Sequence, residues 1–298
     1  MSKGKRAGWL GLGVCALVAA ICVQLVCSMV VMFFYCIAQG FKMAAAGISQ
    51  ADIMAEMMNS VGQITGIVMV VAGVLLLFVF IPWYYFGCGR PKISRELVGR
   101  TFAPRTLAVV AVIAVGLNYG INCLMLSINI AAPQALEKYN QLMEAAGLGV
   151  SPWANAAAVI LAPLGEELIF RGVVFYYACR AVSGMKNART AFWFANIFQA
   201  LLFGLYHMNV VQGIYAFFIA LALGYLCQRY RSVIPGMLAH LVFNGMSTLF
   251  DGVLYAWIPE ESLLWCSVIG VTGIAVVVAV MALNGLPMAE NKRNVAQS

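Results

Sequence analysis

The stretch LGEELIFRGVVF, residues 164–175, places charged side chains in the middle of an apolar run. Glu166, Glu167 and Arg171 lie inside the segment 153–179, which is long enough to cross a bilayer as a helix. A charge in the middle of a membrane helix costs several kcal/mol, so it is rare unless it is paired or has a function. The segment therefore predicts a membrane-embedded helix that carries a functional site.

The remainder of the chain is equally apolar. Hydrophobic residues make up 63% of it and charged residues 10%, whereas an ordinary soluble domain carries roughly 25% charged residues. Long apolar runs separated by short polar loops predict an all-α, polytopic membrane helix bundle with about eight transmembrane helices. The expected segments are 9–38, 61–86, 107–132, 153–179, 190–207, 210–228, 233–250 and 263–284.

The basic residues indicate the topology. With the N-terminus in the cytoplasm, 15 of the 18 Lys and Arg residues fall in cytoplasmic loops, as the positive-inside rule requires, and both termini are cytoplasmic. The opening MSKGKR is typical of a signal peptide, but the run 9–38 is too long for one, which predicts a retained first helix. The net charge of +7 lacks a basic stripe with interleaved aromatics, so we expect no nucleic-acid partner.

Polar residues are unevenly distributed among the segments. The first three apolar segments contain few of them, whereas the segments between 153 and 250 hold nearly all the intramembrane polar groups. We expect a single transmembrane domain over 1–298. Its catalytic core is 153–250, with accessory segments in 1–152 and the last helix and a cytoplasmic tail in 251–298.

The three charges of the opening stretch divide by helical geometry. Glu167 and Arg171 are four residues apart, so they share a face and are predicted to form an ion pair inside the bundle. Glu166 is rotated by about 100° from Glu167 and faces elsewhere. An unpaired buried carboxylate is costly, so Glu166 needs another partner or a polar pocket.

The two histidines of the chain, His207 and His240, lie in the same half as the acidic pair. His240 and Asn244 are four residues apart and are predicted to face the same way. Glu166 with a histidine can activate water, and an imidazole with a carboxamide can stabilise an oxyanion. Glu166, His207 and His240 can alternatively be drawn as zinc ligands, although the usual HExxH spacing is missing. Either arrangement suits hydrolysis of an amide.

Three motifs in this order resemble a known family. EELIFR (166–171), FGLYH (203–207) and HLVFN (240–244) are similar to the EExxxR, FxxxH and HxxxN motifs of the CPBP family of CAAX-protease and bacteriocin-processing intramembrane proteases, related to the type II CAAX prenyl endopeptidases. The resemblance covers about residues 153–250, and the other segments match only in being hydrophobic.

The resemblance implies a role for each motif residue. Glu166 would activate water with the help of His207, His240 and Asn244 would form an oxyanion hole, and Glu167 and Arg171 would support them. Members of the family have been described both with a metal and with a glutamate-bound water. We favour the metal-free mechanism with no cofactor, because Asn244 is a poor zinc ligand and a good oxyanion donor; zinc is the alternative.

These observations predict a multi-pass peptidase of the cell membrane that cleaves a membrane-associated protein or peptide within the lipid bilayer. Two alternatives belong to other classes. One is a non-catalytic immunity or scaffold protein with the same fold, against which all six motif residues are present. The other is a proton-coupled transporter, against which the polar groups gather in one half without the repeat symmetry that many transporters show.

Overall fold

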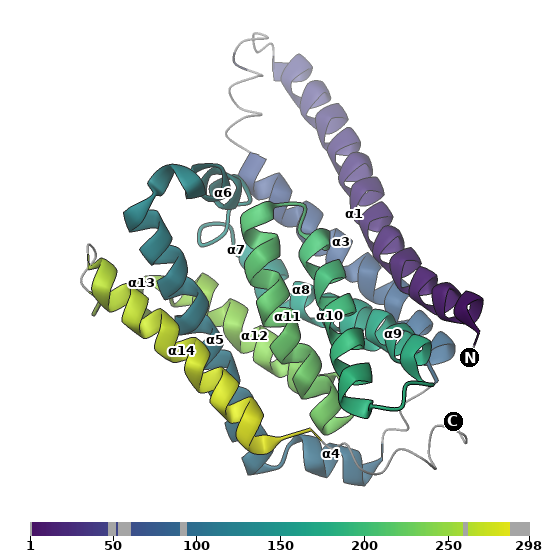
Figure 1. The fold of residues 1–298 in the computed structure, drawn as a ribbon. Coiled ribbons are helices and arrows are strands. Elements are labelled where there is room, and N and C mark those ends of the chain that lie inside the picture. The colour runs from purple at the N-terminus through teal and green to yellow at the C-terminus, as the bar shows by residue number, and fades with distance from the viewer. Residues whose placement is uncertain (1, 47–51, 53–60, 90–93, 259–261, 287–298) are drawn as a thin grey trace.

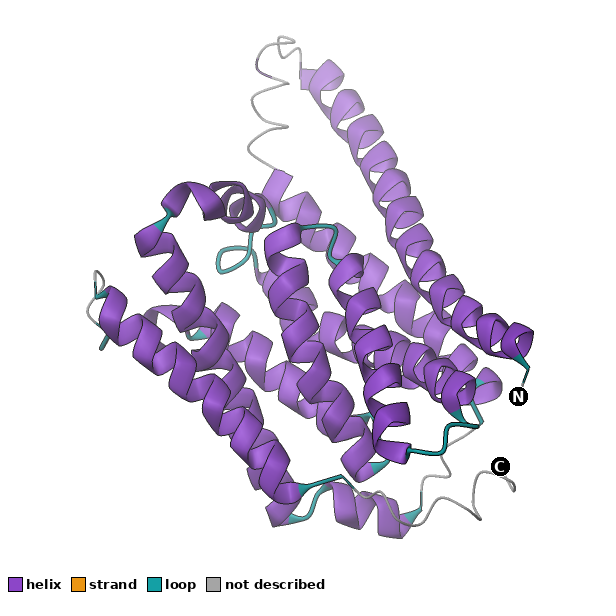
Figure 2. Cartoon of the chain, viewed as in Figure 1, coloured by secondary structure: helices purple, strands orange, loops and turns teal. Residues whose placement is uncertain are grey.

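The computed structural model describes residues 2–46, 52, 61–89, 94–258 and 262–286. Within these ranges the chain consists of helices and short connections, and no strand occurs (Figure 2). The predicted all-α bundle is therefore confirmed. Five of the described helices are long and apolar enough to cross a membrane.

All eight predicted segments are helical. Seven of them correspond to α1 (Lys3–Ala46), α3 (Val61–Pro82) continued by the π-helical turn η1 (Trp83–Gly87), α5 (Pro104–Ala131), α10 (Ala188–Tyr206), α11 (Val210–Tyr230), α12 (Ile234–Leu249) and α14 (Leu263–Asn284). The first helix begins before residue 9 and extends beyond residue 38. Its second half diverges from the bundle and exposes large apolar side chains such as Phe33, Phe34 and Phe41 (Figure 1).

The remaining predicted segment, 153–179, is helical but not regular. It runs as α7 (Pro152–Ala156), η2 (Ala157–Leu161), α8 (Ala162–Glu166), η3 (Glu167–Val174) and α9 (Phe175–Val182), where η2 and η3 are π-helical. We call residues 152–182 the broken helix. Wider π turns of this kind often occur at functional sites, and here η3 begins at Glu167 and includes Arg171.

Three short helices were not predicted: α4 (Arg95–Thr101), α6 (Pro133–Ala145) and α13 (Asp251–Leu254). Proline at the first turn starts α6, because its missing N–H has no partner at a helix start in any case. The side chain of Ser94 accepts a hydrogen bond from the Leu97 amide and caps α4. These short helices lie between the long apolar runs, so the length of an apolar run does not predict them.

The basic connections gather at one end of the bundle. The start of α1, α4, the α9–α10 connection, the α11–α12 turn and the end of α14 all lie there (Figure 1). Contacts tie this end together: Arg180 lies over the Trp9 ring at 5.3 Å, and Arg100 donates to the Tyr230 carbonyl at 3.2 Å. The basic connections thus share one end of the bundle, as the predicted alternation of the loops between the two sides of the membrane requires. Which end faces the cytoplasm stays a prediction.

Glycines allow the helices to pack closely around the broken helix. A Cβ on Gly204 of α10 would lie 2.7 Å from the Gly213 oxygen of α11, so the two backbones touch beside the α10–α11 turn. In that turn Met208 adopts a left-handed conformation with φ of 50°. The side chain of Asn209 then caps α11 by accepting from the Gln212 amide. The turn begins at His207, which is the C-cap residue of α10.

Candidate active site

The predicted ion pair of Glu167 and Arg171 is present. Arg171 Nη1 lies 2.9 Å from Glu167 Oε1, and neither side chain is exposed. The guanidinium also lies over the Phe203 ring, 4.4 Å from its centroid, which adds a cation–π contact. A fully buried pair of this kind needs further polar contacts, because its Coulomb attraction alone does not offset the loss of water.

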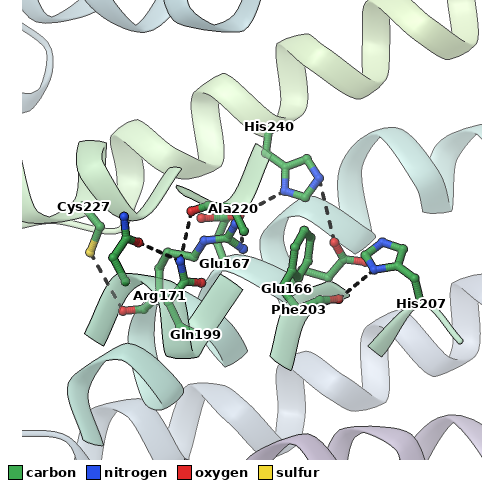
Figure 3. Close-up of polar contacts among 10 residues, drawn as sticks. Glu166, Glu167, Arg171, Gln199, Phe203, His207, Ala220, Cys227 and His240 are labelled. Carbon is green, nitrogen blue, oxygen red and sulfur yellow. Dashed lines mark hydrogen bonds and ion pairs between the residues drawn. The ribbon is translucent and has the colours of Figure 1, made fainter. Parts of the chain in front are cut away.

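His240 supplies one of those further contacts. Its Nδ1 donates a hydrogen bond to Glu167 Oε1 at 3.0 Å, and the imidazole is almost completely buried (Figure 3). Sequence reasoning missed this contact because the residues are 73 positions apart. The bond fixes the Nδ1–H form of the ring and its orientation, as a carboxylate does for a catalytic histidine. Glu167 is therefore the residue that orients His240 as well as the partner of Arg171.

Glu166 lies on the other side of His240. Its Oε2 is 3.8 Å from His240 Nε2, and its side chain is 13% exposed, in contrast to the fully buried Glu167. The distance is too long for a direct hydrogen bond. As the helical geometry predicts, the two adjacent glutamates face different surroundings: Glu166 lines a cavity, and Glu167 is fully buried beside Arg171.

His207 reaches the same region from the end of α10. Its Nδ1 donates to the Phe203 carbonyl at 2.9 Å, which leaves Nε2 as the free ring nitrogen. The Phe203 ring packs edge-on against both imidazoles, with centroid distances of 4.8 Å to His207 and 6.0 Å to His240. In Figure 3 the two imidazoles flank the Glu166 carboxylate. The two histidines, which come from α10 and α12, thus both lie beside Glu166 of the broken helix.

Asn244 also contacts the broken helix, but at another point. Its Nδ2 donates to the Ala158 carbonyl at 2.8 Å, whereas His240 contacts Glu167. Both side chains face the same helix, as their spacing predicts. They contact different residues of that helix, and the Asn244 amide already donates to Ala158. The oxyanion role of Asn244 therefore stays a prediction.

Gly236 of α12 belongs to the site, although the sequence alone did not indicate it. A Cβ at this position would lie 2.8 Å from Glu167 Oε2. Glycine therefore lets α12 approach the buried carboxylate closely enough for His240, one turn later, to reach Glu167. The preceding Pro235 occupies the first turn of α12, where its missing N–H has no partner in any case.

A cavity of about 290 Å³ adjoins Glu166. It lies between α1, α3 and the broken helix, and its lining includes Gln24 of α1, Gly73 of α3 and Tyr206 of α10. Apart from Glu166 and these few polar groups the walls are mainly apolar. The site therefore combines one partly exposed carboxylate with a pocket suited to an apolar chain.

The residues of the alternative zinc site do not form a ligand set. In the parts of the chain that the structure describes, no three His, Cys, Asp or Glu side chains are grouped closely enough to hold a metal ion. Glu166, His207 and His240 lie within those parts, and Nδ1 of each histidine is held in a hydrogen bond, so only Nε2 of either ring could face a ligand. The present arrangement does not fit zinc, so no chemical step is derived through a metal.

Comparison with known proteins gives one result. Residues 149–246 match the family described as type II CAAX prenyl endopeptidase Rce1-like. The matched segment contains all six residues of the three motifs and about a third of the chain. Neither the curated proteins nor the solved structures give a match.

Proposed function

We propose that this membrane protein, whose segment 149–246 matches the Rce1-like type II CAAX prenyl endopeptidase family, is an intramembrane endopeptidase. It would hydrolyse a peptide bond in a membrane-associated protein or peptide at the cell membrane. The observation that carries the proposal is the position of Glu166, flanked by two imidazoles, one of which is fixed by the buried Glu167–Arg171 pair. The catalytic residues would be Glu166, His207 and His240, with Glu167 and Arg171 as positioning residues.

Charge balance supports a distinct role for His240. The buried cluster contains two carboxylates, Glu166 and Glu167, and one guanidinium, Arg171. Because Nδ1 of His240 is held by Glu167, the ring can offer an N–H at Nε2 only as an imidazolium, whose charge would balance the second carboxylate. Its Nε2–H would then face the side of Glu166 and could donate to an oxyanion formed there.

The proposed reaction begins with a water molecule held by Glu166 and the free Nε2 of His207. Glu166 takes a proton from this water as its oxygen attacks the substrate carbonyl carbon. The carbonyl oxygen becomes an oxyanion and is stabilised by the Nε2–H of His240. The tetrahedral intermediate then breaks at its C–N bond, and the proton held by Glu166 passes to the leaving amine. Water is consumed, and the two products are a carboxylic acid and an amine.

The apolar cavity next to Glu166 favours a substrate with a hydrophobic chain. A transmembrane peptide and a lipid-modified peptide both have this property. Two probes separate them in purified enzyme: a farnesylated CAAX peptide and an unmodified apolar peptide of the same sequence. Cleavage of both would assign specificity to the peptide, and cleavage of the first alone to the lipid.

The proposal is tested by comparing membrane peptides from cells that contain the wild type, Glu166→Gln or Glu137→Gln. Glu137 is exposed on α6 away from the site, so it controls for the same chemical change elsewhere. We expect a peptide that is cleaved with the wild type and the control but not with Glu166→Gln. Equal cleavage with all three would reject Glu166 as the base, and no cleavage with any would favour a scaffold role.

A further inference from the structure

The broken helix leaves one backbone carbonyl without its usual partner just before Glu166. In a regular α-helix the oxygen of Ala158 would accept from the amide of residue 162, but the Ala162 amide donates to Ala157 instead. In a continued π-helix the donor would be the amide of residue 163, and residue 163 is proline, which has no N–H. Neither helical pattern can therefore satisfy the Ala158 carbonyl.

Asn244 replaces the missing donor. Its Nδ2 lies 2.8 Å from the Ala158 oxygen, the distance of a good hydrogen bond. We propose that Asn244 is a positioning residue whose amide holds the π-helical turn 157–161 in place and thereby fixes the direction in which Glu166 points. This inference rests on the proposed role of Glu166. It differs from the oxyanion role that the family resemblance implies for Asn244.

The π-helical turn matters because it changes the phase of everything after it. A π turn contains one residue more than an α turn, so losing it rotates the following helix by about 100°. Glu166 and Glu167 are adjacent, so a rotation of that size would carry one glutamate onto the face that the other now occupies. The fully buried glutamate orients His240 and the partly exposed one lines the cavity. The register of the turn thus decides which glutamate has which role.

The position of Asn244 on α12 makes it suited to this task. His240, one turn earlier on the same helix, binds Glu167 at the start of η3. Helix α12 therefore contacts the broken helix on both sides of Glu166: before it through Ala158 and after it through Glu167. Two such contacts from one rigid helix fix both rotation and position, which a single contact would not do.

The test restores the missing backbone donor. Pro163→Ala supplies an N–H that can bond the Ala158 carbonyl in the existing π register, so the amide of Asn244 becomes dispensable. We expect Asn244→Ala to lower kcat at least tenfold with KM changed by less than threefold. In the Pro163→Ala background the same substitution should change kcat by less than threefold. Asn284→Ala, which removes an asparagine bond to the Val280 carbonyl in α14, is the matched control and should have no effect.

If Asn244 acts only on the oxyanion, its loss is equally damaging with proline or alanine at 163, and that result would overturn the proposal. A second measurement does not depend on activity. In the Glu166→Gln protein, Asn244→Ala should raise deuterium uptake in the peptide covering 153–166 and leave α14 unchanged. Unchanged uptake in that peptide would also overturn the proposal, even where Pro163→Ala itself impairs folding. If no variant of the chain cleaves any probe, the proposed function fails, and the exchange result still decides the role of Asn244.

Discussion

The α5–α14 pair and the broken helix are built by opposite means. Helices α5 and α14 are regular, and glycines bring their backbones together: a Cβ on Gly273 would lie 2.7 Å from both the Gly116 oxygen and the Gly120 nitrogen. The broken helix instead changes between α and π turns and holds Glu167 and Arg171 fully buried. Close packing of small and apolar residues dominates the first region, where Ser267 adds a hydrogen bond to Ser127, whereas polar contacts from other helices dominate the second.

The two regions differ in how their backbone and charged groups are satisfied. Regular helices in a membrane satisfy all their own backbone groups and need only shape complementarity. The broken helix leaves backbone groups and charges that other helices must satisfy, and α12 satisfies several of them through His240 and Asn244. Mutations should therefore affect the two regions differently: loss of polar partners should damage the broken helix, and added volume should damage the glycine contact.

The largest effect is expected from Arg171→Ala. The change leaves Glu167 buried without its cation, and breaking a buried ion pair typically costs about 3–5 kcal/mol of stability. The double variant Glu167→Gln with Arg171→Met removes both charges and keeps an oxygen for the His240 N–H. We expect it to recover part of the lost stability in a thermal-shift assay in detergent. A double variant no more stable than Arg171→Ala would contradict the ion pair as the source of the loss.

A somewhat smaller effect is expected from His240→Ala. Removing one oxyanion donor typically lowers kcat by about 10²–10³-fold, while substrate binding changes little. The measurement is kcat and KM on a cleaved peptide, together with the zinc content of the wild type and the variant. Stoichiometric zinc in the active wild type, lost together with activity in His240→Ala, would show that the metal-free mechanism is wrong.

The glycine contact between α5 and α14 provides the opposite kind of test, because here volume is added. Gly273→Ala adds a methyl group where the α5 backbone already touches α14. Overpacking of this kind typically costs about 1–3 kcal/mol, so we expect a lower melting temperature but unchanged kcat for the folded enzyme. Gly11→Ala is the control, since a Cβ at Gly11 meets nothing within 4 Å. A large change in kcat with Gly273→Ala would show that the scaffold and the site are not separable.

These two regions also show what the sequence can predict. The eight helical segments follow from the length of apolar runs, because the bilayer fixes the length of a crossing helix. The Glu167–Arg171 pair follows from its i,i+4 spacing, which is a local property. The basic loops predict the alternation of the connections, and the structure gathers those it describes at one end of the bundle.

Contacts between distant residues were not predictable in the same way. Nothing in the spacing of Glu167 and His240 indicates that they meet, since the contact depends on the packing of α12 against the broken helix. The π turn 157–161 was not predicted either, because its Ala158 carbonyl is bonded by Asn244 from a distant helix. The amphipathic helix α6 was missed because it does not cross the membrane and so lacks a long apolar run.

The smallest perturbation tests the orientation of both regions in the membrane. Lys186 lies in the α9–α10 connection at the basic end of the bundle, and Glu137 lies on α6 at the opposite end (Figure 1). Both are exposed, so a single cysteine at either position should leave stability and activity nearly unchanged. The positive-inside rule places the basic end in the cytoplasm. In a background without the native cysteines, a membrane-impermeant thiol reagent added to intact cells should therefore label Glu137→Cys and not Lys186→Cys. Both variants should react once the cells are lysed, which controls for access to the thiol. Labelling of Lys186→Cys from outside would show that the bundle has the opposite orientation, and Glu166 would then have to receive its substrate from the other face of the membrane.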